Sequence, residues 1–268
     1  MALLVASTLT YSTAGLFTKG VDAGAWAVIF WRGVFAALPT TAWVAARGAL
    51  RREFLGMGRA GLAVGIVGAA GTAAFIPAFK LTSIANVALI YAVAPLIAAL
   101  LAWMVIGERV GRGTALGAVG SLIGVGIIVI GSLGTVNVVG DALAMIMTVA
   151  MAAIMVIYRA RPQTPSAGPS VLQSLLLFPF ALALGAPLQT SPGQIAILAA
   201  FGLLFAIASV TLAEGAKRVP AGQTALLGAL ETPLAPLLAF LILSEIPPVA
   251  TFLGGVVVLV AVLMSLKQ

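Results

Sequence analysis

Apolar residues run along the whole chain in stretches of about 20, separated by short breaks rich in charge, glycine or proline. A helix of that length, rising about 1.5 Å per residue, crosses a hydrocarbon core of about 30 Å. The runs are continuous and do not alternate, a pattern that favours helices over strands. The breaks predict ten transmembrane helices, near residues 2–18, 25–46, 60–79, 85–106, 113–131, 142–158, 171–187, 195–215, 222–244 and 249–266.

Composition agrees with this pattern of helices. The chain is 62% hydrophobic and 8% charged, with a mean hydropathy of +1.20, all far from the range of soluble globular proteins. We therefore expect an all-α integral membrane protein that has the lipid bilayer as its main surroundings. The net charge of +7 comes without a basic stripe interleaved with aromatic residues, so we expect no nucleic-acid partner.

The basic residues fall mostly at one end of the predicted helices. With ten spans, eleven of the fourteen lie on one side: Arg47, Arg51, Arg52, Arg59, Arg109, Arg112, Arg159, Arg161, Lys217, Arg218 and Lys267. Lys19 and Lys80 fall on the other side, and Arg32 falls within the membrane. Because Lys and Arg concentrate in cytoplasmic loops, we expect both termini in the cytoplasm and a bacterial-type cytoplasmic (inner) membrane.

The sequence also repeats at an offset of 137 residues. This offset aligns ALIYAVAPLIAALLAWMVIGE (88–108) with ALLGALETPLAPLLAFLILSE (225–245), and it pairs Lys80 with Lys217. Because five helices separate the paired segments, they cross the membrane in opposite senses. We expect two inverted five-helix repeats, residues 1–131 and 132–268, which is typical of secondary transporters with a site between their halves.

These segments carry a family resemblance. YSTAGLF followed by Lys19, Arg32, FKLTSIANVALIYAVAPLIAALLAWMVIGER and AKRVPAGQTALLGALETPLAPLLAFLILSE occur in the order and spacing of the ten-helix EamA-type exporters. The chain resembles this group of the drug/metabolite transporter superfamily (DMT), and within it looks like the YddG-type amino acid exporters. It departs from the commonest form at Tyr11, where Trp is usual, and at Glu231, Thr232 and Pro233, where Glu-Pro is usual. The resemblance implies alternating access through a central cavity.

Two charges lie inside predicted helices. An ionised group at membrane depth costs about 3 kcal/mol or more, so Arg32 and Glu231 should face the protein interior, a partner or trapped water. Glu231 is a candidate for contact with a substrate ammonium or for taking a proton during transport, and Arg32 for contact with a carboxylate or with Glu231 itself. The alternative for both residues is a structural lock between helices.

Uncharged side chains supply further cavity candidates. Tyr11, Asn86 and Tyr91 are the amphipathic groups with which an apolar pocket orients a small solute. Ser12 and Thr13, beside Tyr11, could instead bond carbonyl groups of their own helix. In the sixth helix, three side chains share about one face and suit either varied apolar ligands or packing: Met151, Met155 and Tyr158.

Four residues are candidates for hinges or gates. Pro95, Pro233 and Pro236 remove backbone donors at membrane depth in the two repeat-related helices. They act either as hinges or as fixed kinks that shape a cavity. Glu214 lies beside Lys217, so we expect an interfacial ion pair, with a role in the cytoplasmic gate as the alternative.

Other classes of function fit the sequence less well. It has no cysteine and no histidine, and its two aspartates, Asp22 and Asp141, fall in predicted external loops. We therefore expect no metal site, no cofactor and no enzyme activity. The phosphate-binding pattern GxxxxGK[ST] is absent, so ATP should not drive the protein directly. A channel predicts rings of polar pore residues, whereas an inverted repeat favours a transporter.

The sequence as a whole predicts a monomeric transporter of small amphipathic metabolites, with amino acids first and export as the direction. The alternative is an exporter of drugs or quaternary cations coupled to protons. A single carboxylate at membrane depth permits proton antiport, but downhill transport fits the same residues, so the coupling stays open.

Overall fold

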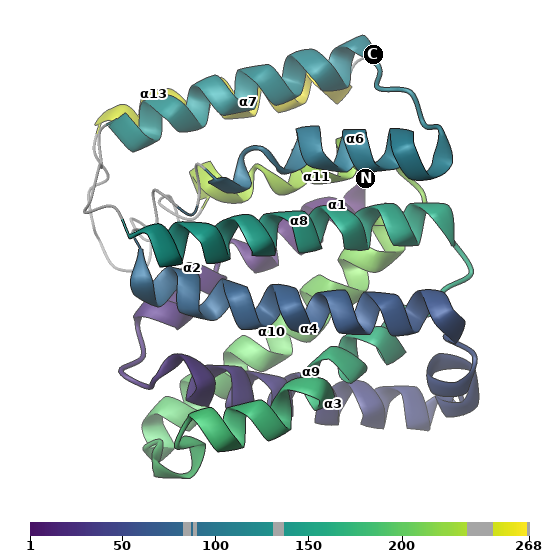
Figure 1. Cartoon of the computed structure of the whole chain (residues 1–268), viewed down its shortest axis with the longest axis vertical. Helices are drawn as coiled ribbons and strands as arrows, with labels where there is room; N and C mark the ends of the chain where they lie inside the picture. Colours follow the sequence, from purple (N-terminus) through teal and green to yellow (C-terminus); the bar gives the residue numbers. More distant parts are fainter. Residues whose placement is uncertain (83–86, 88–89, 131–136, 235–248, 267–268) are drawn as a thin grey trace.

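The computed structural model is a bundle of helices stacked in layers (Figure 1). It describes residues 1–82, 87, 90–130, 137–234 and 249–266. Every regular element in those ranges is helical, as the sequence predicts. Among them, five helices are long and apolar enough to cross a membrane: α3 (Ala25–Ala46), α4 (Gly58–Leu81), α8 (Val138–Ala160), α9 (Ala167–Leu184) and α10 (Pro192–Ala216).

The other predicted spans contain shorter described helices. These are α1 (Ala2–Tyr11), α2 (Ala14–Lys19), α6 (Ala94–Ile106), α7 (Arg112–Ile130), α11 (Ala221–Gly228) and α13 (Val249–Leu266). Two short turns, the π-helical η1 (Arg51–Leu55) and the 3₁₀-helical η2 (Pro187–Gln189), lie between spans. The arrangement is the predicted ten-helix, two-repeat fold. The predicted boundary between repeats, at residues 131 and 132, lies outside the described residues.

The last helices of the two repeats, α7 and α13, pack side by side and antiparallel (Figure 1). A Cβ on Gly120 would lie 2.7 Å from the Cβ of Ala261, and one on Gly124 would lie 2.7 Å from the Gly254 carbonyl oxygen. Contacts therefore run up one helix and down the other. Glycines at this spacing let two helices approach closely.

The second helices of the repeats, α3 and α9, also pack against each other in opposite directions. Gly185, just after the end of α9, contacts Trp26 at the start of α3. Gly33, further along α3, contacts Phe178, which comes seven residues earlier in the chain than Gly185. Repeat-related helices that run antiparallel confirm the inversion of the two halves.

Three spans are broken near their middle. The predicted first helix, 2–18, is divided into α1 and α2 by a turn at Ser12 and Thr13, so its continuity was predicted wrongly. Their side chains bond back to Thr8 and Thr10 carbonyl oxygens, each at 2.7 Å, which was the expected alternative to a cavity role. The fourth and ninth spans break at residues 92–93 and 229–230, which are equivalent under the 137-residue offset.

The ends of α3, α6, α8 and α10 meet at one end of the bundle, together with η1 and the turn at residues 161–166. We call this the basic end, because it carries Arg47, Arg51, Arg159, Lys217 and Arg218. The main buried cluster lies nearer the centre and joins α1, α4, α6, α8 and α11 around the broken spans.

Candidate functional site

Arg32 is held inside the bundle by α3. The residue is 3% exposed, and its Nη2 donates a hydrogen bond of 3.1 Å to the Thr72 hydroxyl of α4. Its Nε has no hydrogen-bond acceptor although that atom is buried. Within the described part of the chain no carboxylate pairs with this guanidinium. Since a buried charge is normally paired with an opposite charge, the arrangement is incomplete.

An aromatic pair from α10 covers the same guanidinium. The Arg32 Cζ lies 3.9 Å from the ring centroid of Phe205 and 5.7 Å from that of Phe201. A cation over a ring face is stabilised by about 2 kcal/mol when it is desolvated, so the rings partly offset the missing anion. Phe205 also contacts Tyr11 edge-on, with centroids 6.0 Å apart. The ring therefore joins α1 to Arg32.

Glu231 begins the short helical stretch 231–234 that follows the break in the ninth span. It is partly buried, and no hydrogen bond or ion pair links it to any residue that the structure describes. The predicted direct contact with Arg32 is not formed, because the two charges lie beyond ion-pair distance. Tyr11 is within electrostatic range of both Arg32 and Glu231. The tyrosine thus lies near two charges that do not touch.

Tyr91 faces the same region from the fourth span. Its hydroxyl is buried and has no hydrogen-bond partner among the residues that the structure describes, and a Cβ on Gly228 of α11 would lie 3.1 Å from it. The Cε of Met155 is 4.0 Å from that same point. Tyr91 is also within electrostatic range of Glu231 and Tyr11. The fourth and ninth spans and α8 therefore converge on one group of side chains, with Met151 packed at its edge. We call these side chains, together with those around Arg32, the central group: Tyr11, Arg32, Thr72, Tyr91, Met155, Phe205 and Glu231.

The breaks themselves satisfy most of their backbone groups locally. Thr8 of α1 donates its hydroxyl hydrogen to the Leu227 carbonyl oxygen at 3.2 Å, and the Leu230 amide donates to the same oxygen. Pro95 lies in the first turn of α6, where its missing amide hydrogen costs nothing. Pro233 packs against Gly255 of α13. Both prolines therefore lie just after the turns; whether they act as hinges stays a prediction.

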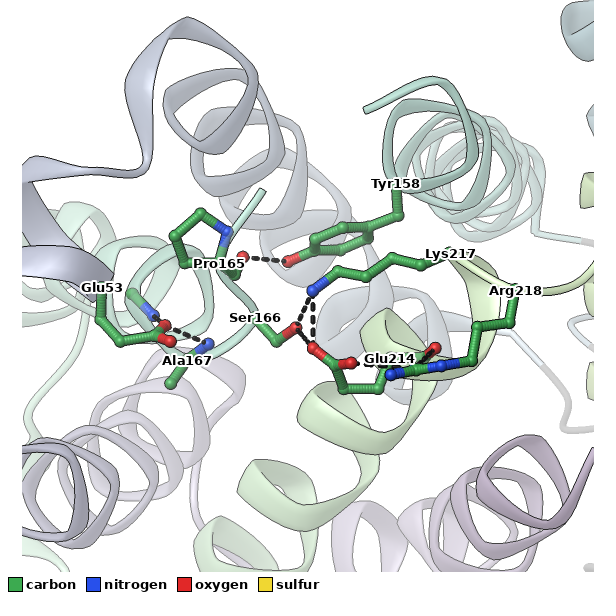
Figure 2. Close-up of polar contacts among 9 residues, drawn as sticks. Glu53, Tyr158, Pro165, Ser166, Ala167, Glu214, Lys217 and Arg218 are labelled. Carbon is green, nitrogen blue, oxygen red and sulfur yellow. Dashed lines mark hydrogen bonds and ion pairs between the residues drawn. The ribbon is translucent and has the colours of Figure 1, made fainter. Parts of the chain in front are cut away.

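The structure separates two predicted residues from this central group. Tyr158 and Glu214 lie at the basic end, where the Tyr158 hydroxyl donates to the Pro165 carbonyl oxygen at 3.5 Å (Figure 2). Glu214 forms the expected ion pairs with Lys217 at 2.6 Å and Arg218 at 2.8 Å. Tyr158 shares a face of α8 with Met155 but lies three residues further along the helix, and therefore about one turn nearer the basic end. Asn86 and Pro236 lie outside the described residues.

Two residues of the central group were missed at the level of sequence. Thr72 and Phe205 both contact Arg32, but threonine and phenylalanine are ordinary residues of membrane helices. The sequence pointed to them only indirectly, because a buried arginine such as Arg32 needs hydrogen-bond acceptors and a ring or a carboxylate nearby.

Two apolar grooves lie on the flanks of the bundle. One, of about 300 Å³, lies between α6 and α7 and includes Pro95 and Trp103. The other, of about 350 Å³, is lined by α3, α9 and Phe54. Neither touches the central group, and their linings are almost wholly hydrocarbon, as expected of surfaces that face lipid tails.

Comparison with known proteins identifies one matching family and a solved structure of similar fold. The sequence pattern of the EamA-like transporter family matches twice, over residues 1–130 and 138–267. A solved structure titled "Crystal structure of protein" is similar to this chain with a TM-score of 0.80 and 21% identity, covering 98% of this chain and 94% of its own. At that identity the likeness concerns the fold. No curated protein matches the sequence.

Proposed function

The chain belongs to the EamA-like transporter family of the drug/metabolite transporter superfamily and is a multi-pass membrane transporter of small molecules, and from this premise we propose that it exports zwitterionic metabolites, amino acids first. The observation that carries the proposal is a pair of opposite charges at membrane depth, Arg32 and Glu231, neither of which forms an ion pair with any residue that the structure describes.

Each charge lacks the group that would complete it. Among the described residues, Arg32 has Thr72 and the Phe205 ring as partners but no anion, and Glu231 has no cation. A lone charge at this depth costs about 3 kcal/mol or more. A solute with a carboxylate and an ammonium group would satisfy both charges at once. Tyr11 and Tyr91 lie within electrostatic range of Glu231, and the Tyr91 hydroxyl, which has no described partner, is a further donor for the same solute.

The surroundings favour a solute with an apolar side chain. The same region contains or borders the apolar side chains of Met151, Met155 and Phe205. The two methionine side chains are flexible and can adapt to different solutes. An amino acid presents this combination of two opposite charges and one variable side chain. The YddG-type resemblance points to the same substrates, and it is part of this proposal.

The alternative substrate class, drugs and quaternary cations, is disfavoured by Arg32. A buried guanidinium that has no counter-ion among the described residues repels a second permanent cation. Glu231 alone would have suited a cation. Tyr11, however, is within electrostatic range of both Glu231 and Arg32, so a cation at Glu231 would also lie in the region of the arginine.

The proposal includes the orientation of the protein in the membrane and the movement of its two repeats. The basic end faces the cytoplasm of a bacterial-type inner membrane, with both termini on that side, because Lys and Arg favour that side. The protein works as a monomer, and residues 1–131 and 132–268 are the two repeats that rock about the central group. The breaks after residues 91 and 228, equivalent in the two repeats, are where the spans bend during alternating access.

The test is uptake into proteoliposomes with three matched competitors: an amino acid, its decarboxylated amine, and its N-acetylated acid. We expect the amino acid to compete best, because only it meets both charges. Arg32→Gln should abolish its advantage over the amine, and Glu231→Gln its advantage over the N-acetylated acid. Arg109→Gln, a change at an exposed arginine, is the matched control.

Three results would contradict the proposal. They are preferential uptake of a quaternary cation, equal competition by all three compounds, and unchanged selectivity in both variants. Repeating the uptake with and without a pH gradient separates proton antiport from downhill transport. Only in the first case should Glu231→Gln remove the effect of the gradient.

A further inference from the structure

At the basic end, a carboxylate of the first repeat lies on the first turn of a helix of the second. The Glu53 Oε2 of η1 accepts hydrogen bonds from the amides of Ala167 at 3.0 Å and Gly168 at 3.1 Å, at the start of α9 (Figure 2). These amides have no partner within their own helix. The backbones are also in close contact, since a Cβ on Gly168 would lie 2.0 Å from the Glu53 carbonyl oxygen.

A second carboxylate of the first repeat makes the same kind of contact. The Glu108 Oε1, just after α6, accepts a hydrogen bond of 3.1 Å from the Ala221 amide at the start of α11. Its Oε2 pairs with Arg159 of α8 at 2.8 Å. Both partners belong to the second repeat. Glu53 and Glu108 therefore join the two halves at this end, each by capping a helix that is more than a hundred residues distant in sequence.

A third contact group ties the turn at residues 161–166 to the end of α10. Ser166 donates its hydroxyl hydrogen to Glu214, and Lys217 donates to both Ser166, at 2.7 Å, and Glu214 (Figure 2). Behind it, side chains of α4, α8 and α10 form a small buried cluster: Val64, Ile154, Tyr158, Ala213 and Ala216. The polar contacts thus lie over an apolar plug that fills the basic end.

The opposite end lacks most of the residues of this network, although Lys217 and Glu108 correspond to the identical residues Lys80 and Glu245. Under the 137-residue offset, Glu53 corresponds to Thr190 and Glu214 to Pro77. Ser166, Arg218 and Tyr158 correspond to the apolar residues Ile29, Leu81 and Val21. Described contacts at that end include Lys80 to the Val21 carbonyl oxygen and Thr82 to Asp141, each at 2.8 Å. An inverted repeat with equal ends would have equal gates, so the difference in residues biases the two states.

We propose that this network is a gate that holds the basic end closed, with Glu53 and Glu108 as latches between the repeats. Carboxylate contacts with helix amides are reversible, because water can replace the carboxylate when the halves separate. The resting protein therefore keeps the basic end shut and opens the opposite end more easily. The gate rests on the transport activity of the family and not on amino acids as the substrate.

The test uses the absence of cysteine from the sequence. Ala213→Cys places one thiol in the plug, where the native residue is 1% exposed. A charged, membrane-impermeant maleimide is added to oriented vesicles from the side of the basic end. Glu53→Gln and, separately, Glu108→Gln should each raise the labelling rate by about fivefold or more, because a neutral amide holds helix amides more weakly than a carboxylate does.

Two controls decide what a faster rate means. Asp141→Asn makes the same chemical change at the opposite end and should not raise the rate. Val125→Cys, buried between α7 and the rest of the fold, should stay unlabelled in the latch variants unless they unfold.

Three outcomes would overturn the gate. They are equal labelling of Ala213→Cys in the parent and both latch variants, an equal rise with Asp141→Asn, and a parallel rise at Val125→Cys. Because labelling needs no substrate, this result does not depend on the uptake experiment, and either proposal can fail alone.

Discussion

Two glutamates in the second repeat have opposite surroundings. Glu214, at the basic end, accepts hydrogen bonds from Ser166, Lys217 and Arg218. Glu231, at membrane depth, has no partner in the described part of the chain. The aromatic hydroxyls differ in the same way, since Tyr158 bonds to a carbonyl oxygen and Tyr91 bonds to nothing described. The polar groups of the basic end are paired within the fold, whereas several polar groups of the central region have no partner among the described residues.

This difference has a physical meaning. A buried polar group without a partner costs about 1–3 kcal/mol, and most folds avoid it. Where several such groups gather around one point, the fold is less stable than it would be with apolar residues there. The basic end shows that this chain can pair its charges, and the groups around Arg32 that have no described partner are therefore the ones that we propose for binding.

The largest effect is expected from Arg32→Gln. A carboxylate held by two charge-assisted hydrogen bonds loses about 3 kcal/mol of binding, so uptake of an amino acid should fall about 100-fold. The variant should nevertheless melt at or above the temperature of the parent, because it removes a buried charge without an ionic partner among the described residues. Uptake and thermal melting in detergent are measured on the same preparation. Normal uptake together with lower stability would make Arg32 a structural lock.

The residues around Arg32 should matter next. Phe205→Leu removes the ring under the guanidinium and the edge contact to Tyr11. A loss of about 1–2 kcal/mol from the cation–π contact predicts a fall in uptake of about tenfold, mainly through a higher KM. Phe252→Leu, at an exposed phenylalanine of α13, is the matched control. Equal uptake by the two variants would show that the ring does not position Arg32.

The sequence predicts the membrane-spanning helices more completely than it predicts the residues of the candidate site. Runs of about 20 apolar residues and the 137-residue offset predict the spans and their inversion, because a bilayer leaves few other solutions. Arg32 and Glu231 are visible because a charge in an apolar run is rare. Phe205 is not, because its role depends on how α10 packs against α3. Ordinary residues acquire a function only through such packing.

The gate shows the same limit. Glu53 lies among Arg51 and Arg52 in a short connection, so in sequence it reads as an interfacial charge. Its contact with α9 spans 114 residues along the chain and depends on the fold. Glu214 was easier to place, because Lys217 and Arg218 lie one turn away on the same helix end.

The third prediction compares the two glutamates directly by stability. Glu214→Gln weakens three charge-assisted contacts of a partly exposed group, so it should cost up to about 1 kcal/mol and lower the melting temperature by about 2–4 °C. Glu231→Gln removes a charge that has no described partner, so the melting temperature should stay equal or rise. Melting curves of both variants at one pH and salt concentration give the comparison. A larger loss for Glu231→Gln would reveal a partner for that carboxylate and would weaken the case for a substrate ammonium there.

The smallest effects should come from removing one hydroxyl in each region. Tyr158→Phe loses a 3.5 Å hydrogen bond to Pro165, a long contact whose loss should cost about 0.5 kcal/mol of stability and leave substrate affinity unchanged. Tyr91→Phe loses a hydroxyl that has no described partner, so stability should not fall. If that hydroxyl binds the substrate, KM should rise about threefold to tenfold, because a hydrogen bond is worth about 1 kcal/mol. Both variants make the same chemical change. A loss of stability in Tyr158→Phe and a loss of substrate affinity in Tyr91→Phe would therefore distinguish a hydroxyl bonded within the fold from one that bonds to the substrate. An unchanged KM in Tyr91→Phe would remove the fourth span from the substrate site and leave Arg32, Tyr11 and Glu231 to hold the solute.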